Sequence, residues 1–534
     1  MDDGNSTTTK LLTLLNVSAT KLGKHKWDVH EEVKRPEKLN KRKTVKVAVV
    51  EGEQSESDAQ DVEMLGGEED ADIQDASYDD EKDGVEDSSG PYESHFGCTP
   101  SCLSTSSRSS VDTKSWKVSK SSRGKLGQTS EFVPEGLEPS TSKKGANAIS
   151  ERLRKPFSAR QAKTSKDQVE LQNDILSAVT GYQDFYSTYS PWEAKKCVRE
   201  AISLHVLNHI TKHRRRVLKN NERLSTASKT KSESPEDVQD QGFTRPSVLI
   251  LLPTRNSALA WFNALISHTP SPEYQIENRS RFTSEYGLPP DAVDKLASAE
   301  PGTYPLDHVE TFKGNVDDCF RVGIKMTRKT MKAFSEFYQC DLIIASPLGL
   351  RQSIQKEKGA DYLSSIEILV MDQLDALTMQ NWDHVKFVLD HLNKMPKDSH
   401  DTDFSRVKPW FLDGHAEYLR QSILLSAYET PETRALFNNN LKNVAGRIRQ
   451  ERRWSPIDVP EGLNQDFVRF DCVSPQDEAD KRFNHFATQV LPAILKSAVQ
   501  STNTVIFIPS YFDFLRVQNH FRTLTGTSFT VLSE

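Results

Sequence analysis

Four short runs of aliphatic residues recur along the middle of the chain, each followed by a polar or turn-forming segment. The runs are Val248–Leu252, Leu342–Ala345, Ile366–Met371 and Ile423–Leu425. Unbroken runs of this kind are typical of strands that are covered on both faces of a parallel sheet. Helical spacing of apolar residues is found between them, at Ser257–Ser267, Arg328–Tyr338 and Trp382–Lys394. The alternation predicts a doubly wound α/β domain over residues 241–440.

The chain before this domain divides into two parts. Residues 1–150 are of low complexity, first acidic and then rich in Ser and Lys, and they predict a disordered tail. Residues 151–240 carry apolar residues at helical spacing followed by a polar linker, so they predict a helical extension. A helix is expected to start near Ser190-Pro191, a pair suited to an N-cap and a first helical position.

Charge is distributed unevenly along the sequence. Between Glu51 and Glu93 there are 18 Asp or Glu residues against the single Lys82, which gives that stretch a net charge of 1 − 18 = −17. Since the whole chain carries −7, the remainder carries +10. The part able to fold is therefore basic, and electrostatics favour a polyanionic partner for it.

The sequence after the α/β domain predicts a basic linker and the start of a second unit. Residues 441–466 form the linker, and residues 467–534 contain a predicted helix from Pro475 to Ala498 and a predicted strand at Thr504–Ile508. This is too little for a complete second domain, so a truncated one is expected. The tetrapeptide that begins at Asp477 reads Asp-Glu-Ala-Asp, but Ser474 precedes it as an N-cap and its carboxylates fit a first helical turn.

Each of the four strands ends in a polar segment, and ligands of such sheets bind at the carboxyl ends of the strands. The segments are Pro253-Thr254-Arg255, Ser346-Pro347-Leu348-Gly349, Asp372-Gln373-Leu374-Asp375 and Ser426-Ala427-Tyr428. Their order is that of the motifs of a DEAD-box-like RNA helicase. The sequence contains no G-x-x-x-x-G-K-[ST] loop to cradle phosphates. In the acidic motif, Asp372 and Asp375 are present, but Gln373 takes the place of the Glu that positions the attacking water, and an amide cannot act as a base.

Candidate RNA contacts lie at the strand ends and in the basic linker. At the strand ends, Thr254, Arg255 and Ser346 stand in the RNA-backbone motifs, with Arg351 as a shifted substitute for a motif arginine. Arg255 has an alternative role, which is to pair with a nearby carboxylate. The linker candidates are Arg447, Arg449, Arg452, Arg453 and Trp454, where bases could stack on the indole and arginines bind phosphates, or where the segment is simply solvated.

Six cysteines in 534 residues, with only Cys98 and Cys102 close together, form neither a disulfide framework nor a repeated metal-ligand pattern. The apolar runs are far too short to span a membrane. We therefore expect a soluble intracellular protein with no metal, no cofactor, no membrane partner and no small-molecule substrate.

Several long segments resemble the digestive organ expansion factor family, a degenerate DEAD-box-like group of U3 small nucleolar RNA-associated proteins of the small-subunit processome. The segments are Gln241–Pro246, Val248–Ala258, Asp317–Arg321, Asp341–Leu350, Val370–Gln373 and Pro509–Arg516. The resemblance implies a RecA-like helicase domain and an incomplete second one. It also implies a location in the nucleus and nucleolus, partners that include pre-ribosomal RNA, U3 small nucleolar RNA and processome proteins, a role in small-subunit biogenesis, and no ATPase activity.

The sequence therefore leaves three functional hypotheses open. The first is an RNA- and protein-binding scaffold built on an inactive helicase fold. The second is an ATP-dependent RNA helicase with a divergent nucleotide site, which depends on the fold and on Asp372. The third is a purely protein-binding adaptor whose acidic tract binds basic partners.

Overall fold

The computed structural model describes residues 90–136, 149–188, 194–230, 235, 238–269, 274–290, 292–327, 329–400, 402–451, 461–463, 465–469, 471–496 and 504–532. The chain divides into two compact units at Arg453 and Trp454, and each is described by itself. Within the described residues, no helix combines the length and the apolarity that a bilayer crossing requires.

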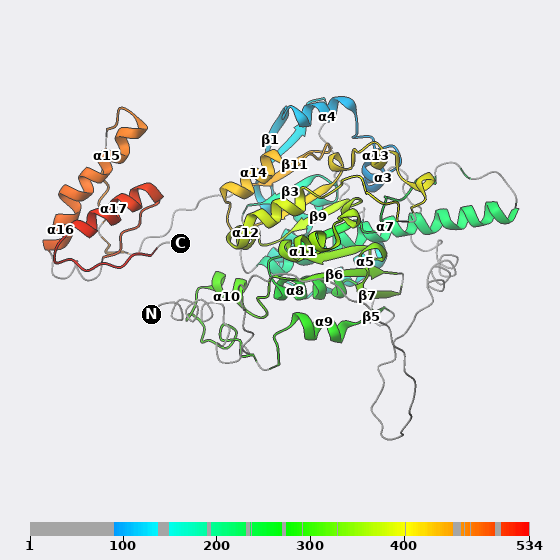
Figure 1. Cartoon of the computed structure of the whole chain (residues 1–534), viewed down its shortest axis with the longest axis horizontal. Helices are drawn as coiled ribbons and strands as arrows, with labels where there is room; N and C mark the ends of the chain where they lie inside the picture. Colours follow the sequence, from blue (N-terminus) through cyan, green and yellow to red (C-terminus); the bar gives the residue numbers. More distant parts are fainter. Residues whose placement is uncertain are drawn as a thin grey trace, which may run out of the picture. The chain divides into compact units, whose positions relative to one another are not determined.

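The described part of the first unit is built around one eleven-stranded sheet (Figure 1). The strands are β1 (Trp116–Arg123), β2 (Gly127–Pro134), β3 (Asp184–Ser187), β4 (Val248–Leu251), β5 (Gln275–Glu277), β6 (Arg321–Met326), β7 (Thr330–Ser335), β8 (Leu342–Ala345), β9 (Ile368–Met371), β10 (Gln421–Leu425) and β11 (Arg447–Gln450). Their order is β1-β2-β11-β3-β10-β9-β4-β8-β6-β7-β5. The six central strands, β11 to β8, run parallel, while β2 joins β11 and β6 joins β8 in antiparallel fashion.

Helices cover both faces of this sheet in Figure 1. Those of the first unit are α3 (Pro91–Phe96), α4 (Thr105–Asp112), α5 (Glu151–Gln161), α6 (Lys166–Val179), α7 (Lys195–Thr230), α8 (Arg255–Ser267), α9 (Arg279–Tyr286), α10 (Leu306–Phe312), α11 (Pro347–Glu357), α12 (Leu374–Leu389), α13 (Pro409–Leu412) and α14 (Pro431–Asn439). Side chains alternate along β4: Val248 and Ile250 pack with residues of α5 to α9, whereas Leu249 and Leu251 pack with α11, α12 and α14. Burial on both faces explains why the central strands are aliphatic without interruption.

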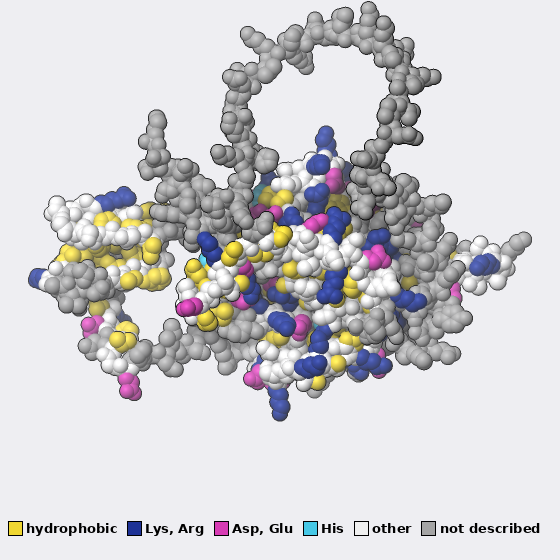
Figure 2. Space-filling model, turned by 90° about the horizontal axis from the view of Figure 1, so that it is seen from below, with side chains coloured by type: hydrophobic (Ala, Val, Ile, Leu, Met, Phe, Trp, Pro, Cys, Tyr) yellow, Lys and Arg dark blue, Asp and Glu magenta, His cyan; other side chains and the backbone are white. Residues whose placement is uncertain are grey.

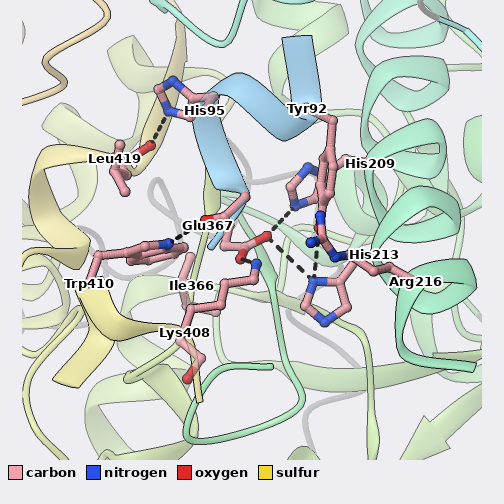
Figure 3. Close-up of polar contacts among 12 residues, drawn as sticks. Tyr92, His95, His209, His213, Arg216, Ile366, Glu367, Lys408, Trp410 and Leu419 are labelled. Atoms are coloured by element: carbon pink, nitrogen blue, oxygen red, sulfur yellow. Dashed lines mark hydrogen bonds and ion pairs between the residues drawn. The ribbon is translucent and has the colours of Figure 1, made fainter. Parts of the chain in front are cut away.

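A buried charged network connects elements at the amino edge of the sheet (Figure 3). Glu367, directly before β9, is 2% exposed and receives the Lys408 ammonium at 2.7 Å. His209 of α7 lies 2.9 Å from the other carboxylate oxygen, and His213 lies 3.6 Å from it. Tyr92 of α3 covers the network, with its hydroxyl 3.4 Å from His213. The Lys408 charge holds the pKa of the Glu367 carboxyl well below its usual range, against the opposing effect of burial.

The structure differs from the expectation that disorder extends to residue 150. Residues 90–136 form α3, α4 and the hairpin β1–β2, and β2 pairs with β11 through Phe132 opposite Arg447. Phe96 is 1% exposed, and the Trp410 indole donates to the carbonyl of Gly97 at 2.9 Å. Long-range pairing and two buried aromatic anchors thus order a segment whose local composition is polar. Of the predicted tail, residues 1–89 and 137–148 lie outside the described residues.

Two further segments differ from their predicted type. The range 151–240 is not only helical, because it contributes β3 to the centre of the sheet, where apolar Phe185 is fully buried. Within the range predicted as the helix Arg328–Tyr338, residues 330–335 form β7 instead, with Met331 and Ala333 buried on one face. In both segments the apolar run is too short for its periodicity to distinguish a strand from a helix. Pairing with neighbouring strands fixed the strand conformation.

The second unit contains α15 (Pro475–His485), a π-helical turn (Phe486–Val490), α16 (Leu491–Lys496) and α17 (Tyr511–Thr523). Ser474 accepts a hydrogen bond from the backbone N–H of Asp477, so the acidic tetrapeptide lies in a capped first turn, as predicted. The predicted strand at Thr504–Ile508 has no strand partner among the described residues, and its side chains are largely exposed.

Candidate functional site at the carboxyl edge of the sheet

The four sequence signatures meet at one edge of the sheet. Strands β10, β9, β4 and β8 are parallel neighbours, so the segments that follow them lie side by side at their carboxyl ends. Strand β3 adds a fifth end next to β10 and leads into α7. A strand–loop–helix unit here is where a phosphate-binding loop is built in nucleoside triphosphatases. In this chain the connection, residues 188–194, contains no glycine.

Asp372 keeps the carboxylate of the acidic motif, and the protein itself engages both of its oxygens. The Trp261 indole of α8 donates to Oδ2 at 2.8 Å, and the backbone N–H of Gln373 donates to Oδ1 at 2.8 Å. Asp372 is 7% exposed, so these two bonds replace most of its hydration. The tryptophan partner comes from a different helix and carries no motif signal in the sequence.

Gln373 and Asp375 of the acidic motif help to form the local structure. Gln373 adopts a left-handed backbone conformation, with φ of 57°, and starts α12. Its side chain is 5% exposed, and its amide oxygen has no hydrogen-bond partner among the described residues. Asp375 accepts the backbone N–H of Ala427 at 3.0 Å, which joins the acidic motif to the Ser426-Ala427-Tyr428 segment.

Lys195 is a residue of this edge that the sequence reasoning missed. It begins α7 directly after the connection from β3, the position at which phosphate-binding loops carry their lysine. Burial lowers the pKa of Lys195, and the carboxylates of Asp372 and Asp375 act in the opposite direction. The aromatic pair Phe185-Tyr186 is the sequence signal that could have indicated the strand β3. A strand there would in turn have placed Lys195 at the start of the helix that follows it.

Thr254 and Arg255 form the start of α8. The Thr254 hydroxyl accepts the N–H of Ser257 as an N-cap, and the residue is 5% exposed. The Arg255 guanidinium lies 3.3 Å from the Asp317 carboxylate and donates to the carbonyls of Glu285 and Cys319 at 3.2 Å. The geometry thus matches the carboxylate-pairing alternative for Arg255.

Ser346 and Arg351 belong to α11. Ser346 is 1% exposed, and its hydroxyl caps the helix by accepting the N–H of Gly349 at 3.0 Å. The Arg351 guanidinium lies 2.9 Å from Nδ1 of His384 and 5.0 Å from the ring centre of Phe387, both on α12. Arg351 therefore connects two helices that cover the same face of the sheet.

The basic linker candidates separate into strand residues and residues outside the described part. Arg447 and Arg449 lie in β11, within the first unit. Arg447 is 4% exposed and stacks over Trp116 at 4.1 Å, a core position that a phosphate cannot reach. Arg449 pairs with Glu429 at 3.3 Å. Arg452, Arg453 and Trp454 lie outside the described residues.

Among the residues that the structure describes, one group of side chains has a spacing that could hold a cation. Ligand atoms of Asp361, Asp398 and His400 lie within 4.8 Å of one another. However, Oδ2 of Asp361 already accepts the N–H groups of Lys397 and Asp398 and lies 2.9 Å from the His400 ring. The group closes a loop with its own hydrogen bonds and does not require an ion.

The chain matches two family models and a set of curated relatives. Residues 182–448 match the model "UTP25, NTP hydrolase-like domain", and residues 457–534 match "Utp25, C-terminal domain". U3 small nucleolar RNA-associated protein 25 of Sclerotinia sclerotiorum is 38% identical over 467 residues, which cover 85% of this chain and 63% of that protein. The proteins of the same name from Schizosaccharomyces japonicus and Schizosaccharomyces pombe are 36% and 37% identical, over 93% and 86% of this chain and 77% and 70% of their own lengths.

Similarity to solved structures is weaker. The yeast DEAD-box splicing factor Prp28 aligns with 14% identity and a TM-score of 0.29, over 77% of this chain and 74% of that chain. The RecA-like assignment of the first unit therefore depends on its strand order and on the family match. With both family models and relatives over most of its length in agreement, the chain belongs to the family of U3 small nucleolar RNA-associated protein 25.

Proposed function

We propose that this protein is a nucleolar RNA- and protein-binding scaffold that acts with U3 small nucleolar RNA in the small-subunit processome, without hydrolysing nucleotides. The part of this proposal that concerns nucleotide hydrolysis is supported by the make-up of a single site. At the edge where a triphosphate and its magnesium ion would bind, the β3–α7 connection has no glycine, Gln373 replaces the base, and both Asp372 oxygens are engaged by the chain.

The binding half is supported by family and charge. The curated relatives are named as U3 small nucleolar RNA-associated proteins, and the chain outside its acidic tract carries +10. The chain spans 63% of the length of the first relative, so partners are assigned here as part of the proposal. The sheet and the helices on its faces are retained, so a binding surface can persist on this fold without its nucleotide chemistry.

The test is magnesium-dependent ATP binding by calorimetry and RNA-stimulated ATP turnover, with an active DEAD-box helicase measured in parallel. We expect neither signal from the full chain. Gln373→Glu should restore neither, because the phosphate-binding loop is still missing. Turnover that Asp372→Asn abolishes would contradict the proposal and favour the divergent helicase.

The binding half has its own test. Crosslinking of the protein to RNA in cells, followed by sequencing, should enrich pre-ribosomal RNA and U3 small nucleolar RNA over other abundant RNAs. If no RNA is enriched while processome proteins co-purify after ribonuclease treatment, the protein is an adaptor and the RNA half is wrong.

A further inference from the structure

A small pocket, called here the α11–α12 pocket, lies at the carboxyl edge of the sheet between the helices that follow β8 and β9. Its floor is apolar and consists of Pro347 and Leu348 at the start of α11 and Leu377 of α12. Its volume is about 120 Å³, and an apolar cavity of about 150 Å³ can hold a benzene ring. The pocket is open to solvent on one side, so it has room for one flat six-membered ring of a larger ligand.

Asp318 forms another side of the pocket, from the segment that leads into β6. Because β6 runs antiparallel to β8, this segment lies at the carboxyl end of β8. The backbone N–H of Ser346 holds it there by donating to the carbonyl of Phe320 at 3.0 Å. Gly349 permits the close approach, since a Cβ at that position would lie 2.3 Å from the same carbonyl oxygen. The fold therefore fixes Asp318 beside the starts of both helices.

The carboxylate of Asp318 is the group in the pocket that most needs a hydrogen-bond donor. It is half-buried, and no hydrogen bond or ion pair joins it to another of the described residues. Burial and the neighbouring carboxylate of Asp317 raise the pKa of Asp318, while His384 acts in the opposite direction. Asp317 itself is paired with Arg255 at 3.3 Å. A partly desolvated carboxylate of this kind gains free energy from a ligand that supplies N–H groups.

Three polar side chains of α12 complete the pocket, and their existing bonds determine which atom each can offer to a ligand. Gln380 uses its amide nitrogen to donate to the carbonyl of Pro253 at 3.0 Å, so its oxygen remains an acceptor. Asn381 uses its oxygen to accept a backbone N–H of α12 at 3.0 Å, so its nitrogen remains a donor. Nδ1 of His384 lies 2.9 Å from the Arg351 guanidinium, which can only donate. The proton of the neutral ring is therefore on Nε2, which is a second donor.

This set of donors and acceptors matches the Watson–Crick edge of guanine better than that of any other RNA base. Guanine presents two adjacent donors, N1–H and the N2 amino group, beside the acceptor O6. The two oxygens of Asp318 can accept from both donors, while Nε2 of His384 or the amide of Asn381 donates to O6. Adenine, cytosine and uracil place an acceptor next to their donor, and that acceptor would face the carboxylate.

We propose that the α11–α12 pocket binds one guanine base of single-stranded RNA. The inference rests on the RNA binding proposed above and adds base selectivity to it. In Figure 2, Lys and Arg side chains outnumber Asp and Glu side chains on the face that is drawn, which suits the RNA backbone. Phosphate contacts position a strand without selecting its sequence, so the pocket supplies a property that positive charge alone does not.

The experiment compares variants of the full chain on RNAs that differ at one base. Each RNA carries a fluorescent label and has four uridines on both sides of a central guanosine, inosine, adenosine or uridine, and binding is measured by fluorescence anisotropy. Inosine differs from guanosine only in lacking the N2 amino group. The variant is Asp318→Asn. The matched control is Asp383→Asn, which removes the same charge from a side chain of α12 that is 77% exposed and lies outside the pocket.

For the unmodified chain we expect the guanosine RNA to bind at least about tenfold more tightly than the adenosine and uridine RNAs, because a bidentate pair discriminates to this extent. The inosine RNA should bind about three- to tenfold more weakly than the guanosine RNA, since one hydrogen bond is lost. In Asp318→Asn the guanosine and inosine RNAs should bind within about twofold of each other, whereas Asp383→Asn should keep the full preference. Asp318→Asn should also melt within about 2 °C of the unmodified chain, because its side chain is only half-buried.

Other outcomes separate the possible failures. If the unmodified chain binds all the RNAs equally, or if Asp318→Asn still distinguishes guanosine from inosine, the pocket inference is wrong and the proposed function stands. If free guanosine monophosphate binds as tightly as the guanosine RNA, and Asp318→Asn removes that binding, the pocket belongs to a free nucleotide and its assignment to RNA is wrong. If no RNA is bound at all, the RNA half of the proposed function fails and this inference fails with it.

Discussion

At the residue scale, two buried carboxyl groups, those of Glu367 and Asp184, differ in whether a cation is close enough to keep them ionised. Glu367 is matched by Lys408 at 2.7 Å, and the pKa of its carboxyl is lowered. Asp184 of β3 is 1% exposed, accepts the N–H of Ser422 at 2.6 Å, and has a second oxygen without a hydrogen-bond partner among the described residues. Burial raises the pKa of Asp184 to about 7, although Arg420 and Arg447 act in the opposite direction.

This pKa predicts the pH dependence of Asp184→Asn. The folded state keeps the proton up to about pH 7, whereas the unfolded chain releases it near pH 3.9. The free energy of unfolding of the unmodified protein therefore falls as pH rises through this window. Between pH 5 and pH 8, the free energy of unfolding measured by chemical denaturation should fall by about 2–3 kcal/mol less for Asp184→Asn than for the unmodified protein.

The control for Asp184→Asn is Asp383→Asn, a change of the same kind at a side chain that is 77% exposed. Its pH profile should follow that of the unmodified protein. If the pH profile of Asp184→Asn also matches that of the unmodified protein, Asp184 is already ionised in the folded state at pH 5 and the argument from burial is wrong.

At the scale of elements, the segment of residues 90–136 shows how a polar sequence becomes ordered. Its anchor is Phe96, whose ring centre lies 5.0 Å from that of Tyr182 and 5.1 Å from that of His209. Composition around it indicated a disordered tail, because Ser, Thr and Lys dominate and the apolar anchors are few. The strands β4, β8, β9 and β10 were predictable, because each is an aliphatic run whose burial needs no distant information.

Phe96→Ala should detach α3 from the amino edge of the sheet. Loss of a fully buried aromatic ring typically costs about 3–5 kcal/mol, and here it also removes the ring that packs against His209 of the Glu367 network. We expect that loss in the free energy of unfolding, together with faster proteolysis within residues 97–115. Val118→Ala on β1, where the side chain is 51% exposed, should change stability by less than about 0.5 kcal/mol. Equal protease resistance of the two variants would contradict the anchoring role.

At the scale of the whole molecule, the folded first unit is larger than the domain that the family model matches. The match starts at residue 182, but β2 pairs with β11, and α5 and α6 contribute Leu153 and Ile175 to the core. A fragment that starts at residue 182 would therefore expose the edge of β11 and part of the core.

Thermal unfolding of two fragments tests this dependence. Residues 90–453 should unfold cooperatively within about 2 °C of the corresponding transition in the full chain, because the unit boundary lies at Arg453. Residues 182–453 should melt at least about 10 °C lower, since several kcal/mol of packing are lost. The same melting temperature for both fragments would show that residues 90–181 are an accessory rather than part of the fold.

Local sequence is sufficient to predict the α/β class, the four aliphatic strands and the signatures at their ends, and to find the missing glycine loop and Gln373, because each depends on residues that are adjacent in the chain. The remaining features depend on the folded structure. It placed Arg447 in the core, gave Asp372 its Trp261 partner, and brought Lys195 to the carboxyl edge of the sheet. These relations join segments far apart in sequence, and only the burial and strand pairing of the folded chain bring them within reach of each other.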